Sequence, residues 1–118
     1  MLLVTITNAF HQDLSAEANI LYASESIVEI LGYNPEEVVG RSCFEYFHPE
    51  EIPFARNKHD KSVQQDQASV LHYARIRSRS GRWVGCECVF TVVSDVLVAC
   101  TSIYKVDEKH ESTSRTYV

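Results

Sequence analysis

The 118-residue chain has no apolar run long enough to span a bilayer, and its first residues lack the basic region and cleavage site of a signal peptide. It has no glycine-rich phosphate loop, and no serine or cysteine sits in a recognisable nucleophile motif. Basic residues are few, 11 against 16 acidic ones, for a net charge of −5. These absences predict a protein that is not an enzyme, does not contact nucleic acid directly or insert in a membrane, and resides in the cytoplasm or nucleus.

The four cysteines do not form the loop-rich pattern of a disulfide-stapled secreted domain. Cys43 falls in a helical turn, whereas Cys86, Cys88 and Cys100 fall in predicted strands. Cys86 and Cys88 point to one apolar face of their strand, without the turn from which structural zinc usually takes its ligands. The sequence therefore predicts reduced thiols, packed in the core, and no metal site.

The basic residues concentrate at one place, a predicted hairpin turn that carries Arg75, Arg77, Arg79 and Arg82. Clustered arginines bind phosphate backbones when they form a broad patch. In a chain of net negative charge, four arginines around one turn are more typical of a solvated strand edge. The prediction here is a solvated edge.

Short apolar stretches in the first quarter of the chain predict two strands, over Leu3–Phe10 and Asn19–Ala23. Ser24 then suits the N-cap of a helix that runs to about Leu31. Gly32 suits the residue that ends this helix.

Two further helix starts follow, and both place proline and carboxylates in the first turn. Asn34-Pro35-Glu36-Glu37 predicts a brief helix with a capping box, and Ser42–Tyr46 predicts a helical turn. His48-Pro49-Glu50-Glu51 predicts the start of a longer helix. Its apolar stripe consists of Ile52, Ala55, His59 and Val63.

After Asp66 the apolar period changes from helical to alternating, which predicts three long strands over Ser69–Ser78, Arg82–Ser94 and Val96–Lys105. Tight turns between them predict an antiparallel meander. The expected fold is α+β, with one antiparallel sheet and the helices on one face. Residues 1–105 are expected to form the domain and 106–118 a tail or linker, in a piece of a longer protein.

Four motifs in this order resemble the PAS domain family: 20–24 (ILYAS), 30–37 (ILGYNPEE) with Gly40, 47–51 (FHPEE) and 80–84 (SGRWV). The resemblance covers about residues 5–105. It implies a five-stranded sheet cupped by helices around a small pocket, with partners on the outer face of the sheet. The stretch 42–49 is similar to fungal members in light-responsive and other transcriptional regulators.

Gly40-Arg41-Ser42-Cys43 also resembles the flavin-binding light-oxygen-voltage subfamily, in which a cysteine at this place adds to the flavin. The likeness ends there, because Phe44-Glu45-Tyr46-Phe47 replaces the stretch with the flavin-contacting Arg and Gln. The long strands also lack the amide side chains that hydrogen-bond the edge of the flavin ring. Cys43 is therefore expected to be a buried thiol, with flavin binding as the less favoured alternative.

His59 lies on the apolar face of the predicted long helix, where the resemblance places the proximal ligand of PAS haem sensors. A neutral imidazole in an apolar pocket is a competent haem ligand. The alternative is a buried histidine that hydrogen-bonds a backbone carbonyl, and the lack of a surrounding haem pattern favours it. A small-molecule sensor that binds haem through His59, or flavin near Cys43, is the second functional reading.

The first functional reading rests on the outward face of the predicted strand 82–94. Residues 84, 86, 88, 90 and 92 are expected to point inward, which turns Trp83, Val89 and Val93 outward. By parity, Leu71 and Tyr73 are expected on the same face. An apolar outward face predicts an interface, covered by a second PAS domain in a homo- or heterodimer or by a flanking helix. The sequence thus predicts a PAS module for interaction and sensing within a signalling or transcriptional regulator.

Overall fold

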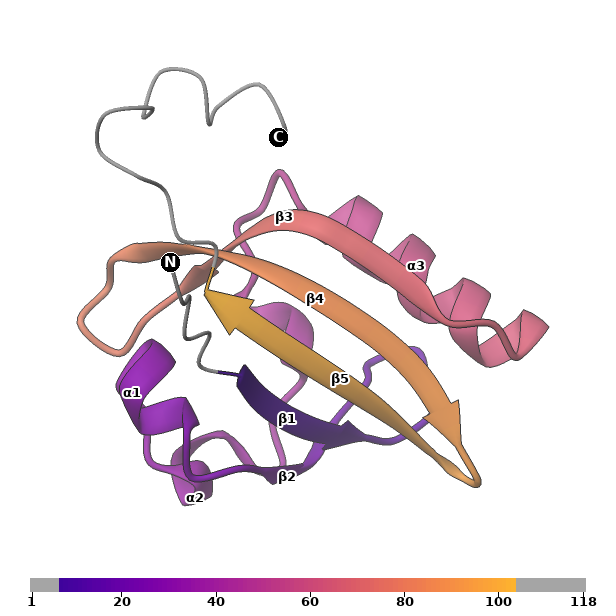
Figure 1. Cartoon of the computed structure of the whole chain (residues 1–118), viewed down its shortest axis with the longest axis horizontal. Coiled ribbons are helices and arrows are strands. Elements are labelled where there is room, and N and C mark those ends of the chain that lie inside the picture. Colours follow the sequence, from indigo (N-terminus) through magenta and orange to yellow (C-terminus); the bar gives the residue numbers. More distant parts are fainter. Residues whose placement is uncertain (1–6, 104–118) are drawn as a thin grey trace, which may run out of the picture.

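The five strands of this computed structural model form a single antiparallel sheet. They are β1 (Thr7–Gln12), β2 (Ile20–Ala23), β3 (Ser69–Arg77), β4 (Trp83–Val93) and β5 (Val96–Ile103). Across the sheet their order is β2-β1-β5-β4-β3 (Figure 1). The structure describes residues 7–103, so the predicted strand start at Leu3, the strand end at Lys105 and the tail 106–118 lie outside the described residues.

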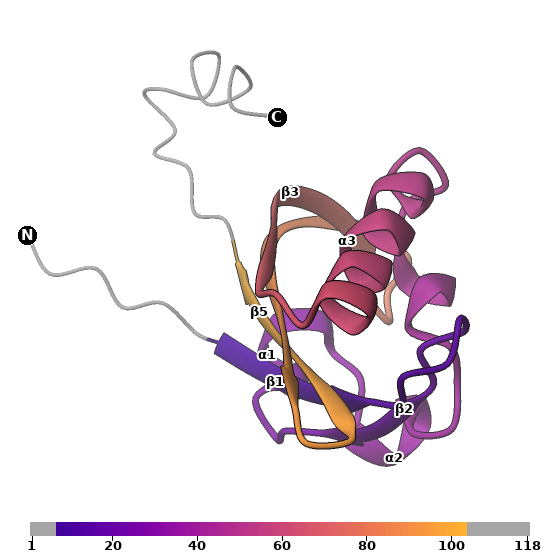
Figure 2. The ribbon, with the colours of Figure 1, turned by 90° about the vertical axis from the view of Figure 1, so that its right-hand side faces the viewer.

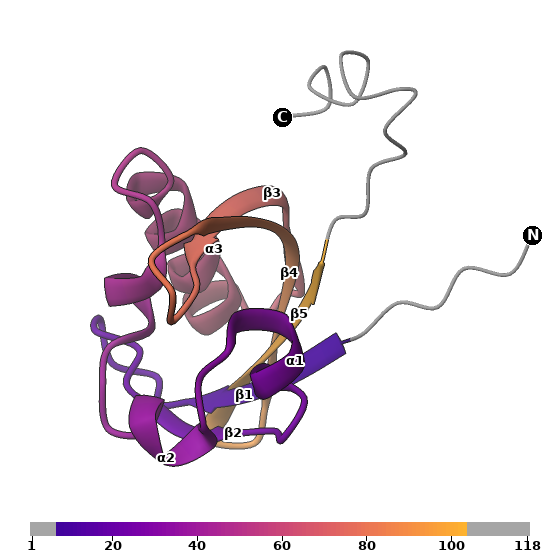
Figure 3. The ribbon, with the colours of Figure 1, turned by 90° about the vertical axis from the view of Figure 1, so that its left-hand side faces the viewer.

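The helices all lie in the connection between β2 and β3. They are α1 (Ile27–Leu31), α2 (Pro35–Val38), the 3-10 helix η1 (Cys43–Tyr46) and α3 (Ile52–Gln65). Two views along the sheet show α1, α2 and α3 on the same side of it (Figures 2 and 3). The predicted architecture, one antiparallel sheet with helices on one face, is confirmed. Among the described residues, no helix has the length and apolar character needed to cross a membrane.

Ser24 does not cap α1 as the sequence predicts. Its hydroxyl instead accepts a hydrogen bond from the backbone N–H of Ala9 at 3.0 Å and donates one to Asn8 Oδ1 at 2.6 Å. The N-cap position belongs to Ser26, whose side chain makes no capping bond. Ser24 therefore ties the start of the helical segment to β1. The predicted end of α1 at Gly32 is confirmed by the left-handed backbone there, with a φ of 84°.

The helix start at Asn34 is confirmed, because the Glu37 carboxylate accepts from the Asn34 backbone N–H at 2.7 Å. The start at His48 is wrong, and α3 begins only at Ile52. The reason is tertiary. The His48 backbone N–H donates to the Arg75 carbonyl at 2.8 Å, so this segment pairs with β3 before the helix begins.

Backbone pairing from the β2–β3 connection covers part of both edges of the sheet. At the β2 edge, the Ile20 N–H donates to the Arg41 carbonyl, and the Gly40 N–H donates to the Ile20 carbonyl. At the β3 edge, Phe47 forms a bridge with Ile76. The helical connection thus runs along one edge strand and then the other.

The predicted alternation of β4 is confirmed. Cys86, Cys88 and Phe90 are buried against the helices, whereas Trp83 and Val93 are exposed. On β5, Leu97 and Ala99 complete the inner face, and their partners across the strands are Val92 and Phe90. The core therefore lies between this inner face and the helices.

The alternation of β3 contains an irregularity that the sequence does not reveal. Leu71 pairs with Cys88 and the next registered pair is Ala74 with Cys86, so one extra residue lies on β3 between them. Leu71 is consequently buried in the core, and the prediction that it lies on the outer face is wrong. Tyr73, one of the two residues within this irregularity, does lie over the outer face beside Gly85.

Candidate functional sites

A small cavity lies between the inner face of the sheet and the helices. Side chains from β1, β2, α1, α2, η1 and the three long strands line it, and Cys43 and Cys88 are among them. The space open to the centre of a water molecule is about 30 Å³. One water needs roughly 10–15 Å³ of such space, so the cavity holds about two waters or a very small ligand.

Two polar side chains enter this otherwise apolar cavity. Gln12 is buried, and its Oε1 atom has no hydrogen-bond partner. Thr101, on the neighbouring strand β5, donates a weak hydrogen bond from its hydroxyl to Cys88 Sγ at 3.7 Å. An unpaired buried carbonyl oxygen costs about 1–3 kcal/mol, so a hydrogen-bond donor that reached Gln12 Oε1 would be stabilised there. Gln12 is not among the predicted site residues, because the predicted strand ends at Phe10 whereas β1 extends to Gln12.

Cys43 lies in η1 and lines the cavity, as the resemblance to flavin-binding domains implies for its position. Burial raises the pKa of its thiol, with a smaller contribution from Cys88, so Cys43 carries its proton at neutral pH. Ligand pockets for drug-sized molecules measure about 300–1,000 Å³, and a flavin does not fit the space beside Cys43. The side chain therefore contributes apolar lining.

His59 occupies a different place from Cys43. It is 2% exposed, and its Nε2 donates to the Ser15 carbonyl at 2.9 Å, since a carbonyl oxygen only accepts. Its ring packs on that of Phe44 in a T-shaped arrangement, with ring centroids 5.8 Å apart. His59 does not line the cavity, and the cavity is far too small for haem. The residues present do not fit a haem site, and the packed histidine bonded to a backbone carbonyl is what the structure shows.

A cluster at the start of α3 holds ligand atoms of His48, Glu50 and Glu51 within 4.8 Å of one another. Arg75 already forms ion pairs with both of its carboxylates. Its side chain contacts Glu51 at 2.6 and 2.7 Å and Glu50 at 2.8 Å, and its backbone N–H donates to Glu51 at 2.9 Å. Burial raises the pKa of Glu51, but the hydrogen bonds from Arg75 outweigh it and hold the pKa below its usual value. This cluster joins the segment before α3 to β3, and Arg75 already occupies carboxylate oxygens that a metal ion would need.

The outer face of the sheet carries a largely apolar surface, in which Thr91 is a polar member between Val89 and Val93. Directly opposed residues form a row across four strands, Val70–Val89–Cys100–Ala9, and Val93 pairs with Val96 near the β4–β5 turn. We refer to Ala9, Val70, Val89, Val93, Val96, Val98 and Cys100 as the valine surface. All seven are partly or fully exposed, Val93 at 53%. The sequence predicts Val89 and Val93 on this surface. The members on β1, β3 and β5 can be identified only when the pairing of the strands is known.

Polar contacts separate the valine surface from the hairpin end of β4. His72 Nδ1 lies 3.5 Å from a Glu87 carboxylate oxygen. Next along β4, the ring of Tyr73 lies so close to Gly85 that a β-carbon there would be 2.7 Å from Tyr73 Cε1. Trp83 lies beyond these contacts, six residues and about 20 Å of strand from Val89. The outward residues of β4 therefore form two separate surfaces.

A family model described as PAS fold matches residues 20–106 of the chain, which includes the helices and the three long strands. The chain belongs to the PAS fold family. PAS-B of Drosophila melanogaster Cycle, solved with bound ethylene glycol, has the same fold, with a TM-score of 0.75 at 20% identity. That match covers 82% of this chain and 99% of the Cycle chain.

Curated relatives are similar over more than half of this PAS domain. Hypoxia-inducible factor 1-alpha of Gallus gallus is 32% identical over 79 residues, which are 67% of this chain and 10% of that protein. The aryl hydrocarbon receptor nuclear translocator homolog of Drosophila melanogaster is 27% identical over 70 residues, or 58% of this chain and 11% of that protein. The matched region thus spans about a tenth of these relatives. They confirm the predicted class, a PAS module of the kind found in transcription regulators.

Proposed function

We propose that this PAS domain is a non-catalytic interaction module that pairs with another PAS domain through the valine surface. The observation that carries the proposal is the registered row Val70–Val89–Cys100–Ala9, which crosses four strands on the face opposite the helices. The partner is a second copy of the domain or a related PAS domain. The whole protein is then a signalling or transcriptional regulator of the cytoplasm or nucleus.

The chemistry of this surface supports pairing. Branched aliphatic side chains on a rigid sheet lose little conformational freedom when a partner covers them. Contiguous exposed apolar surface is uncommon on soluble monomers and marks sites of interaction. The polar contact between His72 and Glu87 at its boundary supplies the polar rim that interfaces usually have.

Replacing Val93 or Val89 by aspartate is expected to weaken dimerisation at least about tenfold, because each change buries a carboxylate in an apolar contact. Sedimentation velocity over a concentration series measures the dissociation constant. Phe54→Asp is the matched control, since Phe54 is 62% exposed but lies on α3, away from the outer face.

Trp83→Ala is expected to leave this dimer intact, since Trp83 lies apart from the valine surface. A wild-type domain that stays monomeric at high concentration, with no response to a candidate PAS partner, contradicts the proposal. If a longer version of the chain shields Val93 from solvent while remaining monomeric, a flanking helix covers the surface instead.

A second function, small-ligand sensing, is favoured by the unpaired Gln12 Oε1 in the cavity. We propose a ligand of a few heavy atoms that carries a hydroxyl donor, comparable in size to the ethylene glycol in Cycle PAS-B. Titration with ethylene glycol is expected to shift the NMR signals of the Gln12 side-chain amide and Thr101 with a dissociation constant of about 1 mM or weaker. Gln12→Leu should abolish these shifts. Non-saturable shifts spread over the surface contradict the proposal.

A further inference from the structure

The second surface on the outer face surrounds Trp83, and its distinguishing feature is unpaired positive charge. Six arginines lie within residues 7–103. Four of them make ion pairs: Arg41 with Glu45, Arg56 with Glu17, Arg75 with Glu50 and Glu51, and Arg79 with Glu37. Arg77 and Arg82 are both exposed, and neither makes an ion pair with any residue of this range.

Both unpaired arginines are neighbours of Trp83, Arg77 by strand pairing and Arg82 along the chain. Arg77 pairs directly with Trp83 across β3 and β4, so their side chains leave the same face, and Arg82 precedes Trp83 in the chain. The Trp83 ring packs on His48, with ring centroids 4.6 Å apart, and remains 44% exposed. We refer to Arg77, Arg82, Trp83 and His48 as the hairpin patch.

This combination of side chains is typical of a binding site. Tryptophan and arginine are the residues most enriched among those that dominate interface energies. His48 supports one part of the indole, which fixes the ring and leaves an apolar surface free for a partner side chain. Guanidinium groups bind carboxylates in a bidentate geometry, and those of Arg77 and Arg82 have no carboxylate within the described residues.

We propose that the hairpin patch binds an acidic segment of a partner protein, in which carboxylates flank one aromatic or aliphatic residue. The apolar residue packs on Trp83, and the carboxylates pair with Arg77 and Arg82. The chain carries a net charge of −5, so an acidic segment is repelled by most of the domain and attracted by this patch. The segment is thereby directed to one place on the surface.

Nucleic acid fits the patch less well than an acidic peptide. Strong phosphate-backbone binding usually rests on about 6–10 contacts with basic side chains, and two unpaired arginines cannot supply them. The neighbouring arginines, Arg75 and Arg79, already pair with glutamates whose carboxylates would repel a phosphate backbone.

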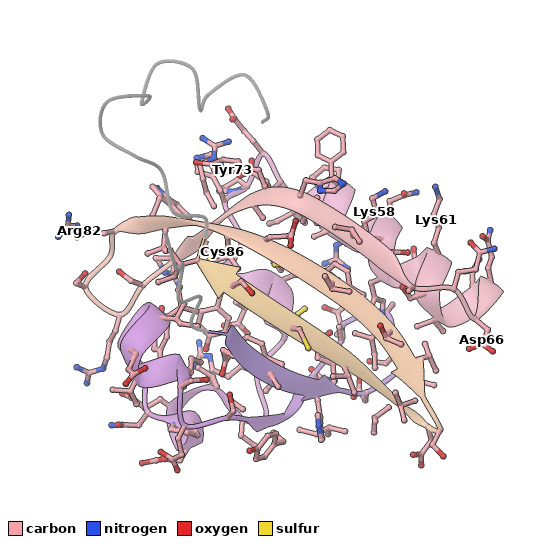
Figure 4. The ribbon with its side chains drawn as sticks, viewed as in Figure 1. Lys58, Lys61, Asp66, Tyr73, Arg82 and Cys86 are labelled. Atoms are coloured by element: carbon pink, nitrogen blue, oxygen red, sulfur yellow. The ribbon has the colours of Figure 1, made fainter. Side chains whose placement is uncertain are left out.

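The test is fluorescence anisotropy with a labelled peptide of about 15 residues that alternates glutamate or aspartate around a central phenylalanine. Arg77→Glu with Arg82→Glu is expected to weaken binding at least about tenfold, and Trp83→Ala about thirtyfold. Lys58→Glu with Lys61→Glu is the control, because it changes the net charge equally. These lysines project from α3 toward the opposite end of the domain from Arg82 (Figure 4). The control is expected to bind within about twofold of the wild type.

Three results would overturn the proposal. The lysine control weakens binding as much as the arginine variant, a peptide with glutamine and asparagine in place of the acids binds equally well, or a single-stranded oligonucleotide displaces the peptide at lower concentration. The hairpin patch is also separable from the proposed dimer. Val93→Asp is expected to disrupt the dimer and keep peptide binding, whereas Arg77→Glu with Arg82→Glu should do the reverse.

Discussion

Replacing Arg75 by methionine is expected to lower the free energy of unfolding by about 3 kcal/mol at pH 7. Methionine keeps much of the side-chain volume but removes the guanidinium. Among the described residues, only the backbone N–H of residue 75 then still donates to the largely buried Glu51 carboxylate. An uncompensated buried charge is more costly than the loss of the ion pair itself. Urea denaturation of the wild type, Arg75→Met, Glu51→Gln and the double variant measures the effect. The double variant should recover part of the loss.

The cost of Arg75→Met should depend on pH in a direction that the Glu51 pKa determines. This pKa is lowered in the folded protein, so the ion pair stabilises the fold above the usual glutamate value of about 4.3 and is lost as pH falls through the lowered pKa. In Arg75→Met, no guanidinium opposes protonation of the buried Glu51 carboxyl, which therefore takes up a proton at a higher pH than in the wild type. The difference between the two proteins should therefore shrink between pH 7 and pH 3. A constant difference would mean that packing, and not charge, accounts for the loss.

Phe90→Ala is expected to lower the free energy of unfolding by about 3–5 kcal/mol. Phe90 is 2% exposed and lies at the centre of the inner face of β4, where its removal leaves a cavity. Thr91→Ala, at the next residue of the same strand, is expected to cost less than about 1 kcal/mol because Thr91 is exposed on the outer face. Chemical denaturation of the two variants measures the contrast. Equal losses would contradict the assignment of inner and outer faces on which both proposed surfaces depend.

The features that the sequence predicts correctly are local. Gly32 ends α1, Glu37 completes the capping box at Asn34, and alternation assigns the faces of β4, because each depends on residues within a few positions. At Gly32, at Asn34 and along β4, contacts with distant residues do not change the conformation that the local sequence favours.

The features that the sequence does not predict depend on contacts between distant residues. Ser24 has the right chemistry for a cap, but Asn8 and Ala9 on β1 take its hydroxyl. Leu71 has the right parity for the outer face until the irregular pairing before Ala74 reverses it. The valine surface needs the register of four strands, and no pattern within one strand contains that information.

The same separation of local and distant information applies to the candidate sites. Gln12 lies beyond the predicted strand end at Phe10, and only the packed structure shows that this side chain is buried and that its oxygen has no donor. The net negative charge of the chain favours a solvated edge at the basic hairpin, and the sequence does not distinguish among its four arginines. The ion pairs of Arg75 and Arg79 leave Arg77 and Arg82 as the distinct pair.

The covered edges of the sheet restrict the ways in which another chain can attach. A strand with free backbone groups is a template for strand addition and for fibril growth. Here Arg41 and Gly40 pair with Ile20 at one edge, while His48 and the Glu51 carboxylate take the Arg75 carbonyl and N–H at the other. Where these groups are taken, an incoming β-strand finds no ladder to extend. A partner that binds at these places must therefore be recognised through its side chains. Side chains differ from one partner to another, whereas backbone groups do not, so this mode of binding allows selectivity.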